Sequence, residues 1–142
     1  MEKLSIPQSL AEWNERGRKY LPGHLGIEVL SVEPDALRAR MKVERSKCAW
    51  NGYLHAGAVV SLADTCCGYA TVRNLPESAA GFTTIELKSN FFGTALEGDV
   101  VCTARPVHKG RTTQVWDAEV IAGQGGKRIA QFRCTQMILY PR

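Results

Sequence analysis

The chain has 142 residues, of which 44% are hydrophobic and 23% are charged, and its formal net charge is +4. These values are ordinary for one soluble globular domain, and no apolar run reaches the roughly 18 residues that a membrane span requires. The basic residues are dispersed, without a lysine- or arginine-rich block, so the sequence does not favour nucleic acid as a ligand.

Five cysteines and three histidines are the candidate metal and redox residues. The cysteines are odd in number and lie mostly in apolar segments, so we expect buried, reduced thiols. Cys66 and Cys67 are adjacent and lack the two-residue spacing of a zinc or redox pair, so we expect no metal. Residues 1–7 lack a basic stretch followed by an apolar core, and the expected location is the cytoplasm.

The first predicted element is an amphipathic helix over residues 5–20, with Leu10, Trp13 and Tyr20 as its apolar contacts. Pro22-Gly23 is predicted to end it. Two strands are expected next, over residues 25–32 and 36–44.

These two strands form a predicted hairpin around the turn Glu33-Pro34-Asp35. In the first strand the apolar alternation changes phase at Leu30, which indicates a bulge. In the second strand, apolar residues alternate strictly with charged ones, as is typical of an antiparallel strand with one solvent-exposed face.

The central feature of the sequence is a helix predicted over residues 56–73 and closed by Asn74 and Pro76. It is almost wholly apolar and rich in small residues, and such a helix is normally buried. Asp64 is the single carboxylate within it. A buried carboxylate has to be solvated by a cleft, paired or used in chemistry, which makes Asp64 a candidate functional residue.

Four further strands are predicted over residues 82–92, 100–107, 111–122 and 127–140. They are separated by turns at residues 97–99, 109–110 and 123–126. In the first of them, the alternation places Ile85, Leu87 and Phe91 on one side. Two strands, one helix and four strands predict a single α+β domain over residues 1–142, in which a mainly antiparallel six-stranded sheet wraps around the helix.

The motif Gly52-x-x-His55-x-Gly57, followed by Asp64 nine residues after the histidine, resembles the hotdog-fold acyl-CoA thioesterases. The resemblance is to the phenylacetate-pathway type and the second 4-hydroxybenzoyl-CoA thioesterase type. It extends to the strand at residues 84–91 and to the turns at residues 96–99 and 109–112. It covers most of the chain from about residue 20 to residue 140.

The resemblance implies hydrolysis of an acyl-CoA thioester without a cofactor other than the coenzyme A of the substrate. It also implies a homodimer, or a homotetramer built as a dimer of dimers, with the active site at the subunit interface. Asp64 would act as nucleophile or general base, and the Ala56 N–H would polarise the thioester carbonyl. The remaining implied site residues are His55 and Gly57 of the loop, Thr84 as a helper, and Asn51, Asn90, Lys109 and Arg111 as substrate-binding residues.

Two departures from the family pattern are visible. Ala56 replaces the first glycine of the usual His-Gly-Gly, and Ala49 stands where an Asn or Gln six residues before the histidine usually orients the thioester. Asn51 is the nearby amide that could substitute. His55 is expected to cap the helix rather than act as a base.

The sequence leaves several alternatives open. One is a non-catalytic acyl-CoA-binding protein, and another is a hydratase or dehydratase on the same fold. Lys109 and Arg111 are either clamps for coenzyme A phosphates or solvated charges. Four aromatic residues either line the acyl pocket or pack: Trp50, Tyr53, Tyr69 and Phe82.

Overall fold

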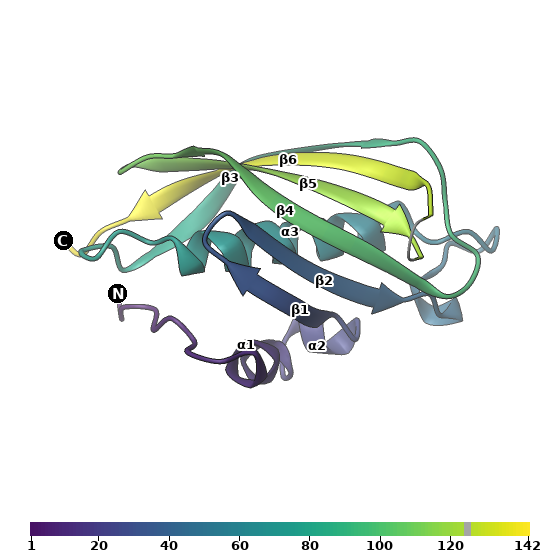
Figure 1. Cartoon of the computed structure of the whole chain (residues 1–142), viewed down its shortest axis with the longest axis horizontal. Coiled ribbons are helices and arrows are strands. Elements are labelled where there is room, and N and C mark those ends of the chain that lie inside the picture. Colours follow the sequence, from purple (N-terminus) through teal and green to yellow (C-terminus); the bar gives the residue numbers. More distant parts are fainter. Residues whose placement is uncertain (124–125) are drawn as a thin grey trace.

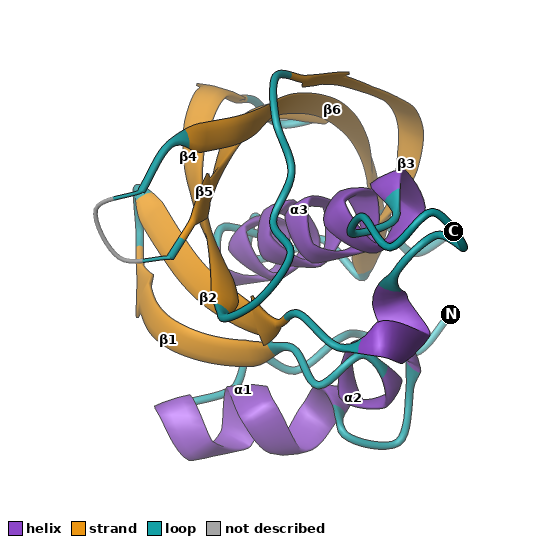
Figure 2. Cartoon of the chain, turned by 90° about the vertical axis from the view of Figure 1, so that its right-hand side faces the viewer, coloured by secondary structure: helices purple, strands orange, loops and turns teal. Residues whose placement is uncertain are grey.

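A computed structural model describes residues 1–123 and 126–142, and it contains one six-stranded antiparallel sheet curved around a long helix (Figures 1 and 2). The strand order is β1-β2-β4-β5-β6-β3. The elements are α1 (Leu10–Gly17), α2 (Leu21–His24), β1 (Glu28–Glu33), β2 (Ala36–Lys42), η1 (Arg45–Lys47), α3 (Ala56–Arg73), β3 (Gly81–Phe91), β4 (Asp99–Lys109), β5 (Thr113–Ala122) and β6 (Arg128–Leu139). The predicted α+β class and the strand–helix order are confirmed.

The central helix α3 has the predicted bounds, and Figure 2 shows it inside the curve of the sheet. Its buried stripe includes Leu62, Cys66 and Ala70, each fully enclosed. Cys67 is also buried, so the interpretation of the adjacent cysteines as packing residues is confirmed. Burial of this apolar helix against the sheet forms the core of the domain.

The N-terminal segment differs from the prediction, because it forms two short helices instead of one. Ser9 caps α1 by accepting a hydrogen bond from the Glu12 N–H at 3.2 Å. Pro22 lies in the first turn of α2 and does not end a helix, since a proline there removes only an N–H that has no intrahelical partner. Of the three expected contacts Trp13 is buried, whereas Leu10 and Tyr20 are 44% and 71% exposed.

Helix α1 protects the free edge of β1. The Asn14 side-chain amide donates to the Val29 carbonyl at 3.1 Å and accepts from the Val29 N–H at 2.7 Å. These two bonds substitute for a neighbouring strand, which an exposed edge would otherwise recruit. The expected bulge in β1 is present, as the register with β2 shifts between Val29 and Ser31.

The strand ends lie within three residues of the predicted positions. Gly98 forms the expected turn with a φ of +76°, and the Gly110 N–H closes the next turn by donating to the Thr113 carbonyl at 2.9 Å. The turn predicted at residues 123–126 includes residues 124–125 and so falls outside the described residues.

Strand β3 is an edge strand, and its predicted side-chain phase is correct for Leu87 and Phe91 but wrong for Thr84. Thr84 pairs with Gln136 and Leu87 pairs with Cys134, with a register shift between them, so Ile85 is the extra residue of a bulge. Gln136 and Cys134 both face the core, and therefore Thr84 and Leu87 share the inner face of the sheet. Uninterrupted alternation along this strand predicts Thr84 on the face opposite Leu87, and the bulge moves it to the same face.

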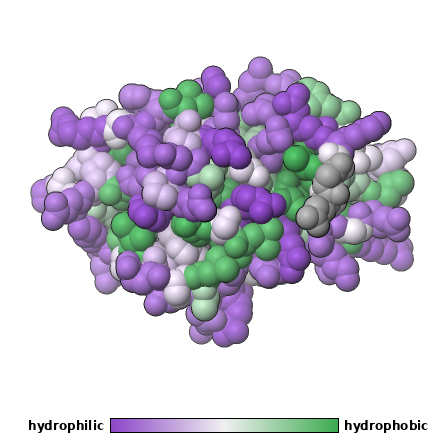
Figure 3. Space-filling model, in the orientation of Figure 1, coloured by the Kyte–Doolittle hydropathy of each residue, from purple (hydrophilic) through white to green (hydrophobic). Residues whose placement is uncertain are grey.

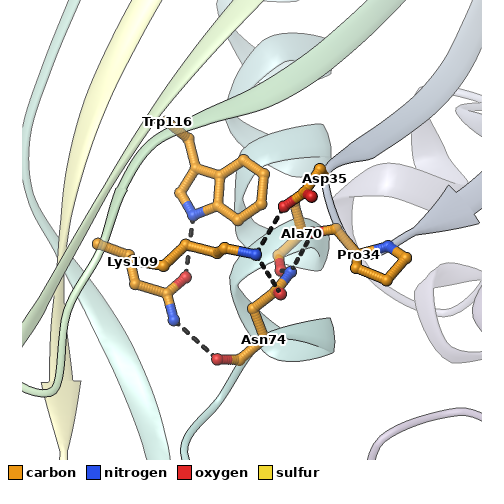
Figure 4. A network of polar contacts seen from close by, with 7 residues as sticks. Pro34, Asp35, Ala70, Asn74, Lys109 and Trp116 are labelled. Atoms are coloured by element: carbon orange, nitrogen blue, oxygen red, sulfur yellow. Dashed lines mark hydrogen bonds and ion pairs between the residues drawn. The ribbon is translucent and has the colours of Figure 1, made fainter.

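Asn74 ties the C-terminal end of α3 to two other parts of the fold (Figure 4). Its side-chain amide donates to the Pro34 carbonyl at 2.9 Å and to the Ala70 carbonyl at 2.8 Å. Its backbone carbonyl accepts a 2.9 Å hydrogen bond from Gln114, which in turn accepts from the indole N–H of Trp116. The helix end, the β1–β2 turn and β5 are thus held by one residue.

Replacing Asn74 with alanine is expected to lower the free energy of unfolding by about 1–3 kcal/mol, because partly buried carbonyls lose their donors. Urea denaturation followed by circular dichroism measures this change. Asn90→Ala is the matched control, because Asn90 is exposed on β3. Equal stability of the two variants would show that the Asn74 network does not hold the helix end.

The surface is mainly polar, and on the face shown in Figure 3 apolar side chains form separate patches among polar ones. None of the helices in residues 1–123 and 126–142 combines the length and apolar character needed to cross a membrane.

Candidate active site

The segment before α3 is a small hairpin, which the sequence pattern did not indicate. Cys48 and Leu54 form a β-bridge, and the Ala49 N–H donates to the Tyr53 carbonyl at 2.8 Å. The Gly52 N–H donates to the Ala49 carbonyl at 2.9 Å, which closes a tight turn. Gly52 has a φ of +89°, a conformation that glycine adopts readily, so this residue allows the turn that leads into the helix.

His55 is the N-cap of α3, in agreement with the expectation. Its Nδ1 accepts a hydrogen bond from the Gly57 N–H at 2.8 Å, and its backbone is extended. A Cβ at position 57 would lie 3.0 Å from His55 Nδ1, so glycine makes room for this cap. The cap occupies the Gly57 N–H, which is therefore not available to a substrate carbonyl.

The Ala56 N–H is the donor that remains open at the helix start. Ala56 is exposed, and none of the described residues accepts a hydrogen bond from its N–H. Unpaired N–H groups at a helix N-terminus carry the positive end of the helix dipole. This donor can therefore polarise a carbonyl oxygen and stabilise an oxyanion.

Asp64 lies two turns further along α3. Its Oδ1 is buried and has no hydrogen-bond partner among the described residues. Burial raises the pKa of the Asp64 carboxyl above its ordinary value of 3.8. A desolvated carboxylate without an ion partner is a stronger base and nucleophile than a solvated one, as the chemistry of a catalytic carboxylate requires.

Thr84 lies on the side of α3 that carries Asp64. Phe82 of β3 packs against Gly68, where a Cβ would lie 3.3 Å from the Phe82 ring. Asp64 is one helical turn before Gly68, and Thr84 is two residues after Phe82 on the same inner face. Because β3 runs back along α3 (Figure 1), both steps lead toward the helix start, and the fold brings Thr84 and Asp64 to the same region.

The two asparagines assigned to the substrate site have different positions. Asn51 is in the hairpin turn, five residues before the start of α3, and its Oδ1 accepts a hydrogen bond from the Tyr53 N–H at 3.2 Å. That bond fixes the side chain and leaves its NH2 group available. Asn90 pairs with Gln131 on the outer face of the sheet, so the protomer does not bring it to Ala56 or Asp64.

Lys109 and Arg111 lie at the opposite end of α3 from Ala56. Lys109 forms a 2.6 Å ion pair with Asp35 and lies 3.4 Å from the Asn74 side-chain oxygen (Figure 4). Arg111 is exposed, and its carbonyl accepts a hydrogen bond from the Tyr140 hydroxyl. Since α3 has 18 residues and is roughly 25 Å long, these cations are remote from the helix start within one protomer.

Ala56 and Asp64 are also separated within one protomer. Eight residues of helix correspond to about 12 Å along the axis, which is too far for both groups to act on one carbonyl carbon. A site that used both groups would need one of them from a second chain.

Of the four aromatic residues that could line a pocket, two pack inside the protomer. Tyr69 contacts Trp13 with ring centroids 5.5 Å apart, and Phe82 packs on Gly68. Tyr53 and Trp50 are exposed on the hairpin, and the Trp50 side chain is fully exposed. The sequence could not separate these cases, because exposure of an aromatic residue depends on contacts between distant segments.

Comparison with known proteins agrees with this geometry. The Thioesterase superfamily matches residues 51–129. The chain is 30% identical to a 1,4-dihydroxy-2-naphthoyl-CoA hydrolase of Listeria monocytogenes, covering 78% of this chain and 89% of the relative. It is 31% identical to the proofreading thioesterase EntH of Cronobacter turicensis, covering 82% of this chain and 83% of that protein.

Solved structures show the same fold. Thioesterase HI1161 from Haemophilus influenzae superposes with a TM-score of 0.88 at 26% identity, covering 94% of this chain and 92% of that chain. A mutant of thioesterase PA1618 from Pseudomonas aeruginosa also gives a TM-score of 0.88 at 28% identity, and the match covers 99% of this chain and 100% of that chain. The chain therefore belongs to the thioesterase superfamily and is a thioester hydrolase with the hotdog fold.

Proposed function

We propose that the protein hydrolyses acyl-CoA thioesters to the free carboxylic acid and coenzyme A. The observation that carries this proposal is Asp64, the single carboxylate of a mostly apolar helix, whose buried Oδ1 has no hydrogen-bond partner among the described residues. The name of the Listeria relative, a hydrolase of an aryl-CoA, supports a CoA thioester as the substrate class. Hydrolysis of such a bond needs no metal or redox cofactor.

In the proposed reaction the thioester oxygen accepts a hydrogen bond from the Ala56 N–H, which stabilises the oxyanion as it forms. Asp64 either removes a proton from the water that attacks the carbonyl carbon, or attacks that carbon itself and forms a mixed anhydride that water then hydrolyses to the free acid. The carbon–sulfur bond then breaks, and the thiolate of coenzyme A leaves and takes up a proton. Thr84 is the proposed helper that holds the water, and its position on the inner face of the sheet supports this role.

The active site is proposed to form between two copies of the chain. Ala56 and Asp64 are about 12 Å apart along one helix. If the α3 helices of two copies pack antiparallel, the start of each helix meets the middle of the other, and Ala56 of one copy lies next to Asp64 of the other. The outer edge of β3 carries no neighbouring strand among the described residues, and its inner-face residues Leu87 and Phe91 are about half exposed. This apolar edge is suited to the second copy. A dimer of dimers is the expected larger assembly.

Asn51 is proposed to replace the amide that is absent at position 49. Its side chain is fixed by the Tyr53 N–H, which leaves its NH2 group available to donate to the thioester. Lys109 is a weaker candidate as a phosphate clamp, because its charge is already paired with Asp35. Arg111 forms no ion pair with the residues that the structure describes, and it is the stronger candidate for that role.

A panel of aliphatic and aryl acyl-CoA esters, with thiol release as the readout, tests the proposal. We expect turnover of at least one class and its loss in Asp64→Asn. Tight binding without hydrolysis over hours would instead identify a binding protein, and hydration of a crotonyl-type ester would identify a hydratase. Either result would overturn the proposed reaction.

A further inference from the structure

We propose that Trp50 and Arg45 bind the adenine nucleotide of coenzyme A at the hairpin that precedes α3. This inference rests on the proposed function, because it assigns the nucleotide end of the same substrate. It concerns a cleft that is separate from the region of Asp64 and Thr84.

Trp50 is displayed on the hairpin rather than packed. It is the second residue of the tight turn that the Gly52 N–H closes on the Ala49 carbonyl, and its side chain is fully exposed. All three tryptophans of the chain are described, and the other two, Trp13 and Trp116, are buried. An indole held in solvent by a rigid turn loses little freedom when it binds a flat partner, which makes it a good stacking surface.

A cleft of about 570 Å³ adjoins the indole. Its lining residues are Val43, Glu44, Arg45, Cys48, Ala49, Trp50, Gly52 and Leu96. Arg45 is exposed and forms no ion pair with the described residues, whereas the Glu44 carboxylate lies 3.5 Å from Lys47 Nζ and is thereby compensated. The cleft thus offers one aromatic face, an apolar wall at Leu96 and one free guanidinium group.

This combination fits a purine nucleotide better than an acyl chain. Bases stack on exposed aromatic rings, and a free guanidinium group binds phosphate oxygens through paired donors. The volume is within the range of small-molecule sites. An acyl chain would leave the Arg45 charge unused and would gain no specific contact from the flat indole.

The position of the cleft also suits the nucleotide end of the substrate. Trp50 precedes Ala56 by six residues, so the two are at most about 20 Å apart along the chain. In an acyl-CoA the long pantetheine arm separates the thioester from the nucleotide. When the carbonyl is at the Ala56 N–H, the nucleotide therefore has to bind at a distance from the helix start, on the surface around it.

Kinetics with a truncated substrate test this assignment. Trp50→Ala is expected to raise KM for the acyl-CoA by about tenfold, with kcat changed by less than about twofold, because stacking acts on binding and not on the reacting carbonyl. The same acyl group on N-acetylcysteamine has no nucleotide, and for it the variant and the wild type should agree within about twofold. Trp50→Phe should recover part of the affinity, and Tyr20→Ala is the control for loss of an exposed aromatic residue elsewhere.

Direct binding of adenosine 3′,5′-bisphosphate provides a readout that needs no catalysis. In the wild-type protein this probe should protect the Trp50 emission from quenching by iodide, which does not reach the two buried tryptophans. Arg45→Gln should weaken binding, most clearly at low salt, where the charge is least screened. Arg105→Gln, which removes another exposed arginine, should not.

The inference is overturned if the bisphosphate leaves iodide quenching unchanged, or if Trp50→Ala impairs the truncated and the full substrate equally. Equal impairment together with a smaller sedimentation coefficient would assign Trp50 to the contact between copies instead. Protection by the bisphosphate in a protein that hydrolyses no acyl-CoA would support the nucleotide site while the proposed hydrolysis fails.

Discussion

Ala56→Pro is expected to lower kcat by about 100- to 1,000-fold while the free energy of unfolding stays nearly constant. Proline removes the one N–H that is open at the helix start, and loss of a single oxyanion donor has a typical effect of this size. The helix itself tolerates the change, because the first helical position is favourable for proline. His55 already has an extended backbone, the conformation that a residue before proline prefers.

Ala56→Gly and Ala56→Ser keep the N–H and are the matched controls. They should retain most of the activity, and circular dichroism with urea unfolding should show all three variants folded. A fully active Ala56→Pro enzyme would exclude the Ala56 N–H as the group that stabilises the oxyanion.

Asp64→Asn is expected to lower kcat by about 100- to 10,000-fold, the range that a catalytic acid–base group contributes. Asparagine keeps the shape and removes the charge, so KM for the acyl-CoA should change far less. Glu86→Gln, on the outer face of β3, is the control for loss of a carboxylate. An active Asp64→Asn variant would remove Asp64 from the mechanism.

The raised pKa of Asp64 also sets the pH dependence. The carboxylate is the active form, so kcat/KM of the wild type should fall as the pH decreases through that pKa, at a pH above the ordinary value of 3.8.

The free energy of unfolding should change with pH in the opposite direction. Because the folded-state pKa is raised, burying the charge costs stability above that pKa, and the cost disappears as the pH falls below 3.8. Asp64→Asn should therefore unfold at a higher urea concentration at pH 7, and this difference should disappear in acid.

Local signals in the sequence predicted the central helix well. A polar loop with His55 before the apolar segment and Asn74 with Pro76 after it define both ends, and the structure keeps these bounds. The bulge in β3 was not predictable in the same way, because it depends on the register with β6, which is more than 40 residues away. The split of the N-terminal helix was missed because Pro22 is compatible with both ending and starting a helix.

The candidate site was predictable in part for the same reason. The spacing from His55 to Asp64 is local, and it identified the helix start at Ala56 and the Asp64 carboxylate, which carry the proposed chemistry. The ion pair between Lys109 and Asp35 joins distant segments, and the exposure of Trp50 depends on the hairpin fold, so neither could be predicted from spacing alone.

The central claim is that one site uses Ala56 of one copy and Asp64 of another, and subunit complementation tests it most directly. Ala56→Pro and Asp64→Asn proteins, each nearly inactive, are unfolded together in equal amounts and refolded. Random pairing places half of the chains in mixed dimers, and each mixed dimer has one intact site, so about a quarter of the wild-type activity should return. If both residues act within one protomer, no mixed dimer contains an intact site and the mixture stays as inactive as its components.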